Sequence, residues 1–386
     1  MYTKTAINEL YRRYAIAIDI SDEMFEKAVG EYKALGKWID QETPDYKISI
    51  YPQGSFALRT VVRPISDEDD YDLDLVCEFA QRYGLSARQL KVDVVKPLLV
   101  NYKRINGEIL NKRRCWHVEY EEIPNFHMDV VPAYANGTSI RITDHDEETD
   151  YYQYMGSNPA GYVKWFFNRC KKQHQLMYET YVRDHNLVIQ QADVEEVKRQ
   201  KVKTPLQRSI QLLKRHRDIM FQDRDEKVKP ISIIITTIAA QLYQEEDNVF
   251  DALKSILENA PQYIRSNMNN GQFFIENPSY AGENFADKWN VHPERAQAFF
   301  DWLYQAQNDL VDDKLLNYDR LTMASHTKRV FGENIGIKVF SQKAEEERAA
   351  VENNTLKVST ATGALSSVGT ISVPRNHHFG TYVSQK

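Results

Sequence analysis

The sequence predicts an α+β protein with two lobes: a lobe built on a mixed β-sheet, followed by a mostly helical lobe. Between about residues 47 and 131, apolar and polar residues alternate in several short runs, as in strands with one buried face. After about residue 151 the alternation fades, and apolar residues recur at the three- and four-residue steps of helices. With 386 residues, 42% hydrophobic and 27% charged, the chain is long enough for two globular domains.

The charge balance and the cysteines exclude several classes of protein. Lys and Arg number 49 and Asp and Glu 55, a net charge of -6, so we expect no strong nucleic-acid footprint. No run approaches 18 apolar residues and the N-terminus is too polar for a signal peptide, so we expect a cytoplasmic protein without a membrane segment. Cys77, Cys115 and Cys170 are widely spaced, which favours buried thiols over a disulfide framework or a zinc site.

The first elements are a helix, a strand and a turn. Apolar residues between Phe25 and Ile39 recur at helical spacing, and Ser21 can cap that helix. Residues 47–51 alternate like a strand that ends in the turn Pro52-Gln53-Gly54-Ser55. We expect a second helix to begin at Gly54-Ser55.

Further strands follow in the first half. Residues 71–76 alternate so that Leu73 and Leu75 face the core. Ser86 forms a capping box with Gln89 and predicts a helix from that point. Two more alternating runs, at residues 115–119 and 126–131, predict strands.

The second half is predicted to be helical. Thr204 forms a capping box with Gln207, and Pro205 occupies the first helical position of a helix that reaches about Met220. Two more helices are expected at residues 231–243 and 293–307.

The predicted domain boundaries follow these changes in pattern. Residues 1–185 form the sheet lobe with its N-terminal helices, and residues 186–345 form the helical lobe. Residues 346–386 are expected to be a flexible C-terminal tail, because residues 353–369 are rich in Ser, Thr, Ala and Gly without an apolar period.

Three carboxylates form the candidate chemical centre. Residues two apart on a strand share a face, so Asp72 and Asp74 project side by side. Asp129 lies opposite an apolar face of its own strand, and three acids converge if the two strands are neighbours. Ionised carboxylates this close repel, so a proton or a cation must compensate them. Oxygen ligands suit Mg²⁺, and Gly54-Ser55 at a helix start suits a phosphate.

Each part of this pattern is weak by itself. Surface strands often carry two acids on their solvated face, and a Gly-Ser pair is common. The ordered combination of Gly54-Ser55, Asp72, Asp74 and Asp129 is far more specific, since these are the parts of a two-metal phosphoryl-transfer site.

The same residues resemble the active-site signature of the nucleotidyltransferase superfamily that includes DNA polymerase beta. Wider segments resemble the bacterial cGAS/DncV-like nucleotidyltransferases, or CD-NTases. The resemblance covers about residues 46–289. The segments that carry it are Tyr51–Phe56, Asp70–Val76, Met128–Pro132, Ser157–Pro159 with Gly161-Tyr162, and Glu283–Phe285 with Trp289.

The resemblance implies a bilobed nucleotidyltransferase fold with nucleoside triphosphates bound between the lobes. It implies that Asp72 and Asp74 bind two Mg²⁺ ions, for which Mn²⁺ can substitute. Asp129 would complete the catalytic metal site and help to activate the acceptor hydroxyl. Gly54 and Ser55 would hold the donor triphosphate.

In the helical lobe the resemblance implies two more phosphate contacts, Lys214 and Ser232. A solvated helix face is the alternative for Lys214, and a plain N-cap is the alternative for Ser232. Residue 233 is Ile where an aromatic side chain could stack on a base, so the base-stacking residue stays unassigned. No His/Cys insertion resembles a zinc thumb, which argues against sensing of duplex DNA.

The expected activity is synthesis of a cyclic di- or trinucleotide messenger from nucleoside triphosphates, with release of pyrophosphate, in anti-phage (CBASS) signalling. The alternatives are a linear oligonucleotide synthase, a transferase acting on RNA or protein, and a regulatory module without activity. Partners implied by the resemblance are an effector that responds to the product and a ubiquitin-transfer-like protein that conjugates the tail.

Overall fold

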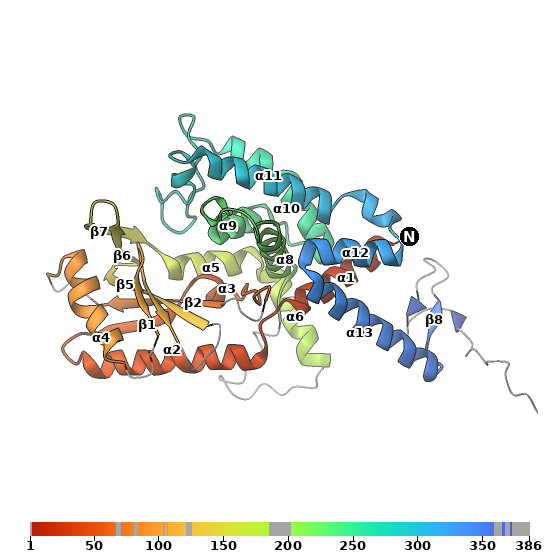
Figure 1. The fold of residues 1–386 in the computed structure, drawn as a ribbon, viewed down its shortest axis with the longest axis horizontal. Coiled ribbons are helices and arrows are strands. Elements are labelled where there is room, and N and C mark those ends of the chain that lie inside the picture. The colour runs from red at the N-terminus through yellow and green to blue at the C-terminus, as the bar shows by residue number, and fades with distance from the viewer. Residues whose placement is uncertain are drawn as a thin grey trace, which may run out of the picture. The chain divides into compact units, whose positions relative to one another are not determined.

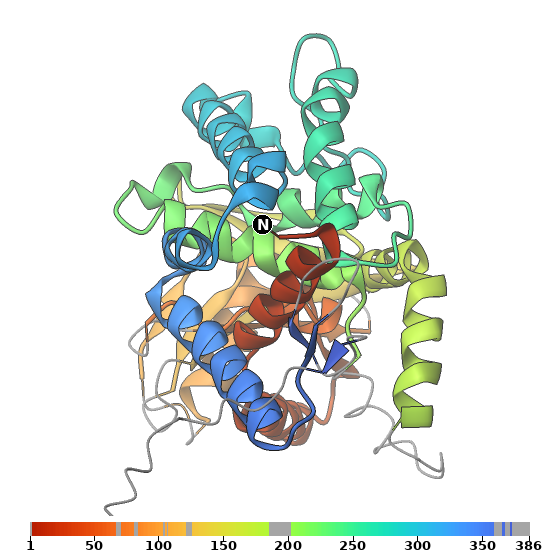
Figure 2. The same cartoon turned by 90° about the vertical axis from the view of Figure 1, so that its right-hand side faces the viewer.

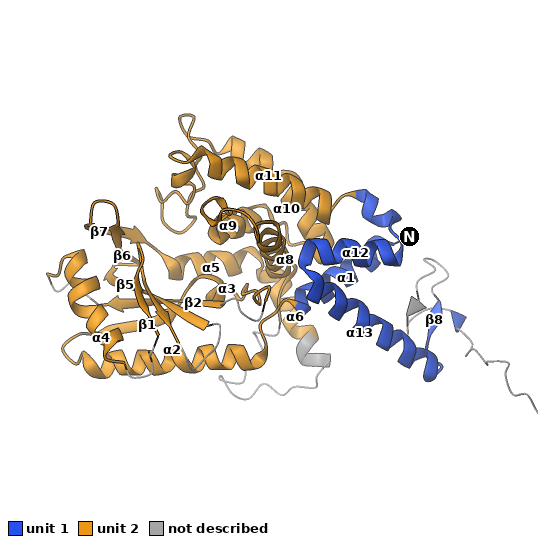
Figure 3. Cartoon of the chain, in the orientation of Figure 1, with its two compact units in different colours: residues 1–17, 313–386 blue, residues 18–312 orange. Residues whose placement is uncertain are grey.

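The computed structural model divides into two compact units, residues 18–312 and residues 1–17 with 313–386 (Figures 1 and 3). Each unit is described separately below. The structure describes residues 2–66, 71–80, 84–102, 105, 107–120, 126–184, 202–358, 365–366 and 371–372.

The larger unit is built on a seven-stranded mixed sheet with the order β1-β2-β5-β4-β3. The two central strands, β2 and β5, are parallel, whereas the other pairs are antiparallel. The long strand β5 pairs with β4 along its first half and with β6 along its second half, and β6 pairs with β7. The strands are β1 (Ile48–Pro52), β2 (Tyr71–Phe79), β3 (Ile109–Asn111), β4 (Trp116–Glu119), β5 (Phe126–Asn136), β6 (Ser139–Asp146) and β7 (Tyr151–Ser157).

One face of this sheet is covered by helices and forms the core. The capped helix predicted at Ser21 is α2 (Asp22–Glu42), where Ser21 Oγ accepts a hydrogen bond from the Met24 N–H. Its apolar side packs with the sheet, and a π-helical segment (Gln89–Val95) followed by α4 (Lys96–Val100) adds to the same cluster. The predicted capping box of Ser86 with Gln89 is also present. The opposite face of β2 and β5 is therefore free to carry polar side chains.

Strands β6 and β7 were not among the predicted strands. In β6 the alternation stops after Ile142, because Thr143, Asp144 and His145 are all buried despite being polar. Arg113 satisfies the Asp144 carboxylate with a 2.8 Å ion pair, so the strand can remain in the sheet without an apolar pattern.

Helices follow the sheet, as predicted. The capping box of Thr204 and Gln207 opens α8 (Pro205–Met220), and α9 (Ser232–Leu242) and α11 (Pro293–Leu310) match the other two predicted helices. Among the described residues of this unit, the other long helices that follow the sheet are α5 (Pro159–Arg169), α6 (Lys171–Asp184) and α10 (Val249–Ser266).

Helix α8 is buried and holds the segment that follows α3 (Gly54–Leu58) through a row of side-chain donors. Gln207 Nε2 donates to the Leu58 carbonyl at 2.9 Å, and Gln211 Nε2 donates to the Val61 carbonyl at 2.7 Å. Arg215 donates further along, to the carbonyls of residues 63 and 64. Each bond satisfies a buried backbone acceptor, so this helix fixes the segment beside the candidate site.

The smaller unit joins α1 (Lys4–Ala17) to α12 (Arg320–Phe331) and α13 (Glu333–Glu352), which lie beside it in both ribbon views (Figures 1 and 2). Tyr14 is its buried anchor: its hydroxyl is 2.7 Å from Thr327 Oγ1 and its ring is 5.1 Å from that of Phe331. Arg13 forms a two-pronged ion pair with Glu346 at 2.8–2.9 Å. Helices distant in sequence thus share one small core.

The C-terminal segment is helical at its start. Helix α13 includes residues 346–352, and short strands β8 (Lys357–Val358), β9 (Leu365–Ser366) and β10 (Ile371–Ser372) form a three-stranded sheet. Residues 373–386, the end of the tail for which the resemblance implies conjugation, lie outside the described residues.

Two remaining features bear on the sequence predictions. All three cysteines are free thiols; Cys77 and Cys170 are buried as predicted, whereas Cys115 is half-buried. No helix in the described parts of the chain is long and apolar enough to cross a membrane.

Candidate active site

The sheet brings the three predicted carboxylates together. Asp72 and Asp74 alternate with Leu73 and Leu75, which are fully buried in the core, so both acids lie on the opposite face of β2. The parallel register places Asp74 directly beside Asp129 on β5. Since neighbouring strands are about 4.8 Å apart, the backbones of these two acids are adjacent. The predicted neighbourhood of the two strands is confirmed.

Asp74 is an electrostatically strained member of this group. Burial raises the pKa of its carboxyl well above the ordinary value, and the charges of Asp72 and Asp129 raise it further, against a smaller opposite effect of Lys214. A partly buried carboxylate between two others is unfavourable unless a proton or a cation compensates it. Electrostatic strain of this kind is expected at a site that binds a cation.

These residues fit a divalent cation. Three carboxylates on adjacent strands provide oxygen ligands, the type that Mg²⁺ prefers. A second observation points the same way, since His117, His127 and Asp129 could also hold a metal ion, their ligand atoms lying within 4.8 Å of one another. The donor set is therefore that of a metal-dependent site.

Gly54 and Ser55 approach the carboxylates at the start of α3. Gly54 has φ +58°, a conformation that favours glycine, and the preceding Gln53 N–H donates to the Asp74 carbonyl at 2.8 Å. A Cβ at residue 54 would overlap the Asp74 carboxylate and lie 3.1 Å from its Cγ. Only glycine lets this turn pass so close to Asp74.

A cavity of about 560 Å³ joins most of the predicted site. Its lining includes Gly54, Ser55, Asp72, Asp74, Lys214 and Ser232. Asp129 is not part of that lining and belongs to the site through its register with Asp74. A second cavity, of about 350 Å³, also includes Gly54 and Asp74, together with Cys115, Tyr162 and Phe285. Asp74 therefore borders two spaces.

Lys214 is not on a solvated helix face, because only 5% of it is exposed. Its Nζ lies 3.2 Å from the Thr60 carbonyl and 3.4 Å from Thr60 Oγ1. Burial and the charge of Arg217 lower the pKa of Lys214 to about 8, while Asp72 raises it. The solvated alternative is wrong, and the lysine is a buried cation at the cavity.

Ser232 is the first residue of α9, and the N-cap is Ile231, so the plain N-cap alternative is also wrong. Its hydroxyl accepts a 2.8 Å hydrogen bond from Arg217, which also donates to the Pro230 carbonyl at 2.9 Å. Arg217 lines the same cavity and was not among the predicted site residues. Its three-residue spacing from Lys214 on a helix was the available signal.

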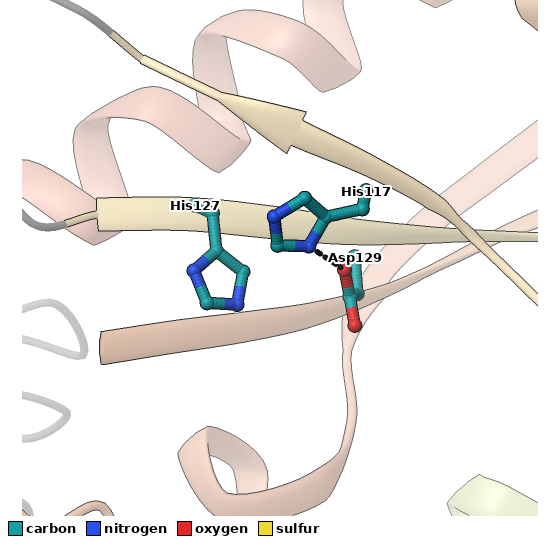
Figure 4. Close-up of side chains that lie close together, drawn as sticks. All are labelled: His117, His127 and Asp129. Carbon is teal, nitrogen blue, oxygen red and sulfur yellow. Dashed lines mark hydrogen bonds and ion pairs between the residues drawn. The ribbon is translucent and has the colours of Figure 1, made fainter. Parts of the chain in front are cut away.

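Two histidines were also missed. His117 Nδ1 is 2.9 Å from the Asp129 carboxylate, and the His127 ring lies 4.3 Å from the His117 ring (Figure 4). His127 precedes Asp129 by two residues, so the same-face rule for strands could have found it. His117 needed the pairing of β4 with β5, which places it opposite Asp129.

Comparisons with known proteins agree with this geometry. Residues 48–134 match the nucleotidyltransferase domain of the cyclic GMP-AMP synthase DncV-like family. A c-di-GMP synthase of Roseivirga ehrenbergii is 29% identical over 356 residues, 89% of this chain and 88% of that protein. The cyclic dinucleotide synthase CdnG of Bradyrhizobium diazoefficiens is 22% identical over 347 residues, 85% of this chain and 82% of that protein.

A solved structure shares the fold. The CD-NTase CdnG of Bradyrhizobium diazoefficiens in complex with GTP superposes with a TM-score of 0.68 at 21% identity, covering 87% of this chain and 98% of that one. A mixed sheet that carries three converging carboxylates beside a Gly-Ser turn, followed by helices, defines a nucleotidyltransferase. Together with the matched domain, these findings show that the chain is similar to the DncV-like nucleotidyltransferases in its sheet region and to cyclic dinucleotide synthases along most of its length.

Proposed function

We propose that this enzyme joins two nucleoside triphosphates into a cyclic dinucleotide and releases two pyrophosphates. The observation that carries the proposal is that Asp74 borders two cavities, of about 560 and 350 Å³. One space can take a donor triphosphate and the other an acceptor nucleotide, with Asp74 between them. The names of the two relatives direct the first test to GTP.

The chemistry is an in-line displacement at the donor α-phosphorus. The acceptor ribose hydroxyl forms the new P–O bond, the bond to pyrophosphate breaks, and the hydroxyl proton leaves. A second round between the remaining hydroxyl and triphosphate closes the ring. Asp129 orients the acceptor hydroxyl, and Gly54, Ser55, Lys214 and Ser232 hold the donor phosphates. Rate enhancement comes mainly from positioning and charge neutralisation.

Asp72, Asp74 and Asp129 would hold two Mg²⁺ ions, for which Mn²⁺ can substitute. When bound, the ions neutralise the triphosphate and lower the pKa of the attacking hydroxyl. The chain's own contribution is to keep three carboxylates converged on two neighbouring strands before any ligand arrives. Their mutual repulsion without a ligand is the cost of that arrangement.

Labelled GTP, ATP and their mixture, incubated with Mg²⁺ or Mn²⁺ and then treated with phosphatase, test the proposal. A phosphatase-resistant product made by wild type and not by the Asp72→Ala/Asp74→Ala double variant supports a cyclising synthase. A phosphatase-sensitive ladder would indicate a linear polymerase instead. The absence of metal-dependent pyrophosphate release with every mixture of nucleotides would contradict enzyme activity.

Lys214→Met is expected to raise KM for the donor nucleotide roughly 10- to 100-fold, because a hydrogen bond to a charged group contributes about 1.5–3 kcal/mol. Its free energy of unfolding should change little, because removing the desolvation cost of the buried cation offsets the lost hydrogen bonds to Thr60, and methionine matches the lysine stem. Nucleotide titration and thermal unfolding measure the two effects.

Lys91→Met is the matched control. Lys91 is also fully buried, burial lowers its pKa to about 8, and its Nζ donates to backbone carbonyls. It does not line the 560 Å³ cavity, so its loss should leave KM unchanged. Equal KM values for wild type and Lys214→Met would remove Lys214 from the proposed phosphate contacts.

The cellular role is part of the proposal. As a CD-NTase, the enzyme would signal through its cyclic product to an effector in anti-phage defence. The tail-conjugating partner stays a prediction from the resemblance, and the terminal residues it concerns lie outside the described part of the chain.

A further inference from the structure

Two histidines stand beside the carboxylate row. His117 on β4 is paired with Asp129 on β5, and His127 on β5 is paired with Asp72 on β2. All these side chains share the polar face of three neighbouring strands. The ligand atoms of His117, His127 and Asp129 lie within 4.8 Å of one another (Figure 4).

The cluster is held in place and can be reached by solvent. His117 Nδ1 is 2.9 Å from Asp129 Oδ1, and its Nε2 is 3.7 Å from the Glu119 carboxylate. The side chains of His117 and Asp129 keep 17% and 26% of their exposure. The two imidazole rings are 4.3 Å apart at 43°, and a nitrogen of each lies within 4.8 Å of the other and of an Asp129 carboxylate oxygen.

Nitrogen donors change which ion is preferred. Carboxylates alone suit Mg²⁺, whereas imidazole suits Zn²⁺, Cu²⁺, Ni²⁺ and iron. Two imidazoles and one carboxylate on adjacent strands form a mixed nitrogen and oxygen donor set. Such a set favours these transition-metal ions over Mg²⁺. The acids around the cluster add negative charge that attracts any divalent cation.

We propose that His117, His127 and Asp129 form a binding position for a divalent transition-metal ion of the Zn²⁺ class. Asp129 belongs both to this position and to the proposed Mg²⁺ site. An ion bound by His117, His127 and Asp129 therefore makes the Asp129 carboxylate unavailable to Mg²⁺. The position therefore makes the enzyme sensitive to Zn²⁺. Only this last consequence rests on the proposed function; metal binding itself does not.

A simpler role for His117 is to orient Asp129 by hydrogen bonding. The two roles differ in which atoms matter. A positioning residue needs a donor near Asp129, which asparagine can supply, whereas a metal ligand needs a ring nitrogen with a free lone pair. In the positioning role His127 contributes its ring contact with His117 at 4.3 Å, which phenylalanine keeps, so the His127→Phe variant separates the two roles.

The test is calorimetric titration of the full-length, metal-free protein with Zn²⁺ and with Mg²⁺, in the absence of nucleotide. Two variants are compared with wild type: His117→Asn, which keeps a donor beside Asp129, and His127→Phe, which keeps a ring against His117. We expect each variant to weaken Zn²⁺ binding roughly 10- to 100-fold, the scale on which metal-site partners act. Mg²⁺ affinity should be unchanged. The visible absorption of added Co²⁺ gives a second readout.

His292→Ala is the matched control, since His292 lies 3.4 Å from Glu294 on the surface as an isolated histidine–carboxylate pair. It should bind Zn²⁺ like wild type. Zn²⁺ affinity unchanged in both site variants would overturn the proposal. Loss in His117→Asn with no change in His127→Phe would overturn the three-ligand position.

Activity gives a consequence that is separable from the binding test. Within each variant, the ratio of Mg²⁺-supported turnover with and without Zn²⁺ is measured. Turnover with Zn²⁺ divided by turnover without Zn²⁺ should be well below one for wild type and near one for His127→Phe. If no protein turns over, the proposed function fails while the binding result still decides the metal position.

Discussion

Asp74→Asn is expected to reduce turnover by about a thousandfold or more, the scale seen when one charge-stabilising group is removed from a catalytic site. Asparagine keeps the size of the side chain but removes the negative charge that lies between Asp72 and Asp129. Pyrophosphate release under saturating nucleotide and Mg²⁺ measures the loss.

The same substitution should stabilise the metal-free protein, by on the order of 1 kcal/mol. Burial and the neighbouring acids raise the pKa of Asp74, so between its ordinary and its native pKa the folded state binds more protons than the unfolded state. The free energy of unfolding of the wild type therefore decreases as pH rises through this range. The asparagine variant lacks this titrating group and should not show that decrease. The gain should be absent below about pH 4 and grow above it.

Asp144→Asn is the control with the opposite sign. Asp144 is buried on the same sheet, whereas Asp74 is half-buried, and Asp144 is paired with Arg113 at 2.8 Å. Although burial alone would raise its pKa, the hydrogen bond and charge of Arg113 lower it. Its stabilising effect is present above the ordinary pKa and is lost as pH falls, so Asp144→Asn should destabilise at neutral pH. Thermal unfolding in EDTA from pH 3 to 8 compares the two variants. Destabilisation by Asp74→Asn at neutral pH would contradict the strained-carboxylate account.

The central part of the site could be predicted because its determinants are local. Asp72 and Asp74 follow from strand alternation, and Asp129 follows from an apolar strand with a single acid on its other face. Capping boxes at Ser86 and Thr204 likewise need only four residues. Local structure predicted from such short-range patterns is found in the folded protein, because the tertiary structure is consistent with it.

The missed parts depend on contacts between distant residues. Arg217 is tied to the Pro230 carbonyl and the Ser232 hydroxyl, and these groups meet only when α8 packs beside the start of α9. Strand β6 lacks a regular alternation of apolar and polar residues because Asp144 is buried. Its carboxylate is paired with Arg113, which is 31 positions away in sequence. No local pattern marks either feature.

Lys214 and Ser232 illustrate what resemblance and structure each contribute. The resemblance selected both residues, and the structure places both on the same cavity as Asp72 and Asp74. Their simpler alternatives depended on exposure and on a capping position, which only the fold could decide. The role in holding phosphate stays a prediction that the Lys214→Met titration tests.

Gly54→Ala is expected to cut turnover by at least about a hundredfold, since misplacing a group in the site by about 1 Å can have that effect. The residue has φ +58°, which costs an L-amino acid about 1–2 kcal/mol. The added Cβ would also occupy the position of the Asp74 carboxylate, so either the turn or the acid must move. Turnover and thermal unfolding should therefore both suffer.

Gly137→Ala separates backbone strain from the clash with Asp74. Gly137 has φ +68° in the turn after β5, but a Cβ there meets no atom within 4 Å. It should lose about 1–2 kcal/mol of stability through its backbone and keep normal turnover. If Gly54→Ala behaved in the same way, with stability reduced but activity intact, the close approach of the turn to Asp74 would have no role in catalysis. Both variants introduce the same kind of backbone strain. Loss of activity in Gly54→Ala but not in Gly137→Ala would therefore show that catalysis needs residue 54 to have no Cβ beside Asp74.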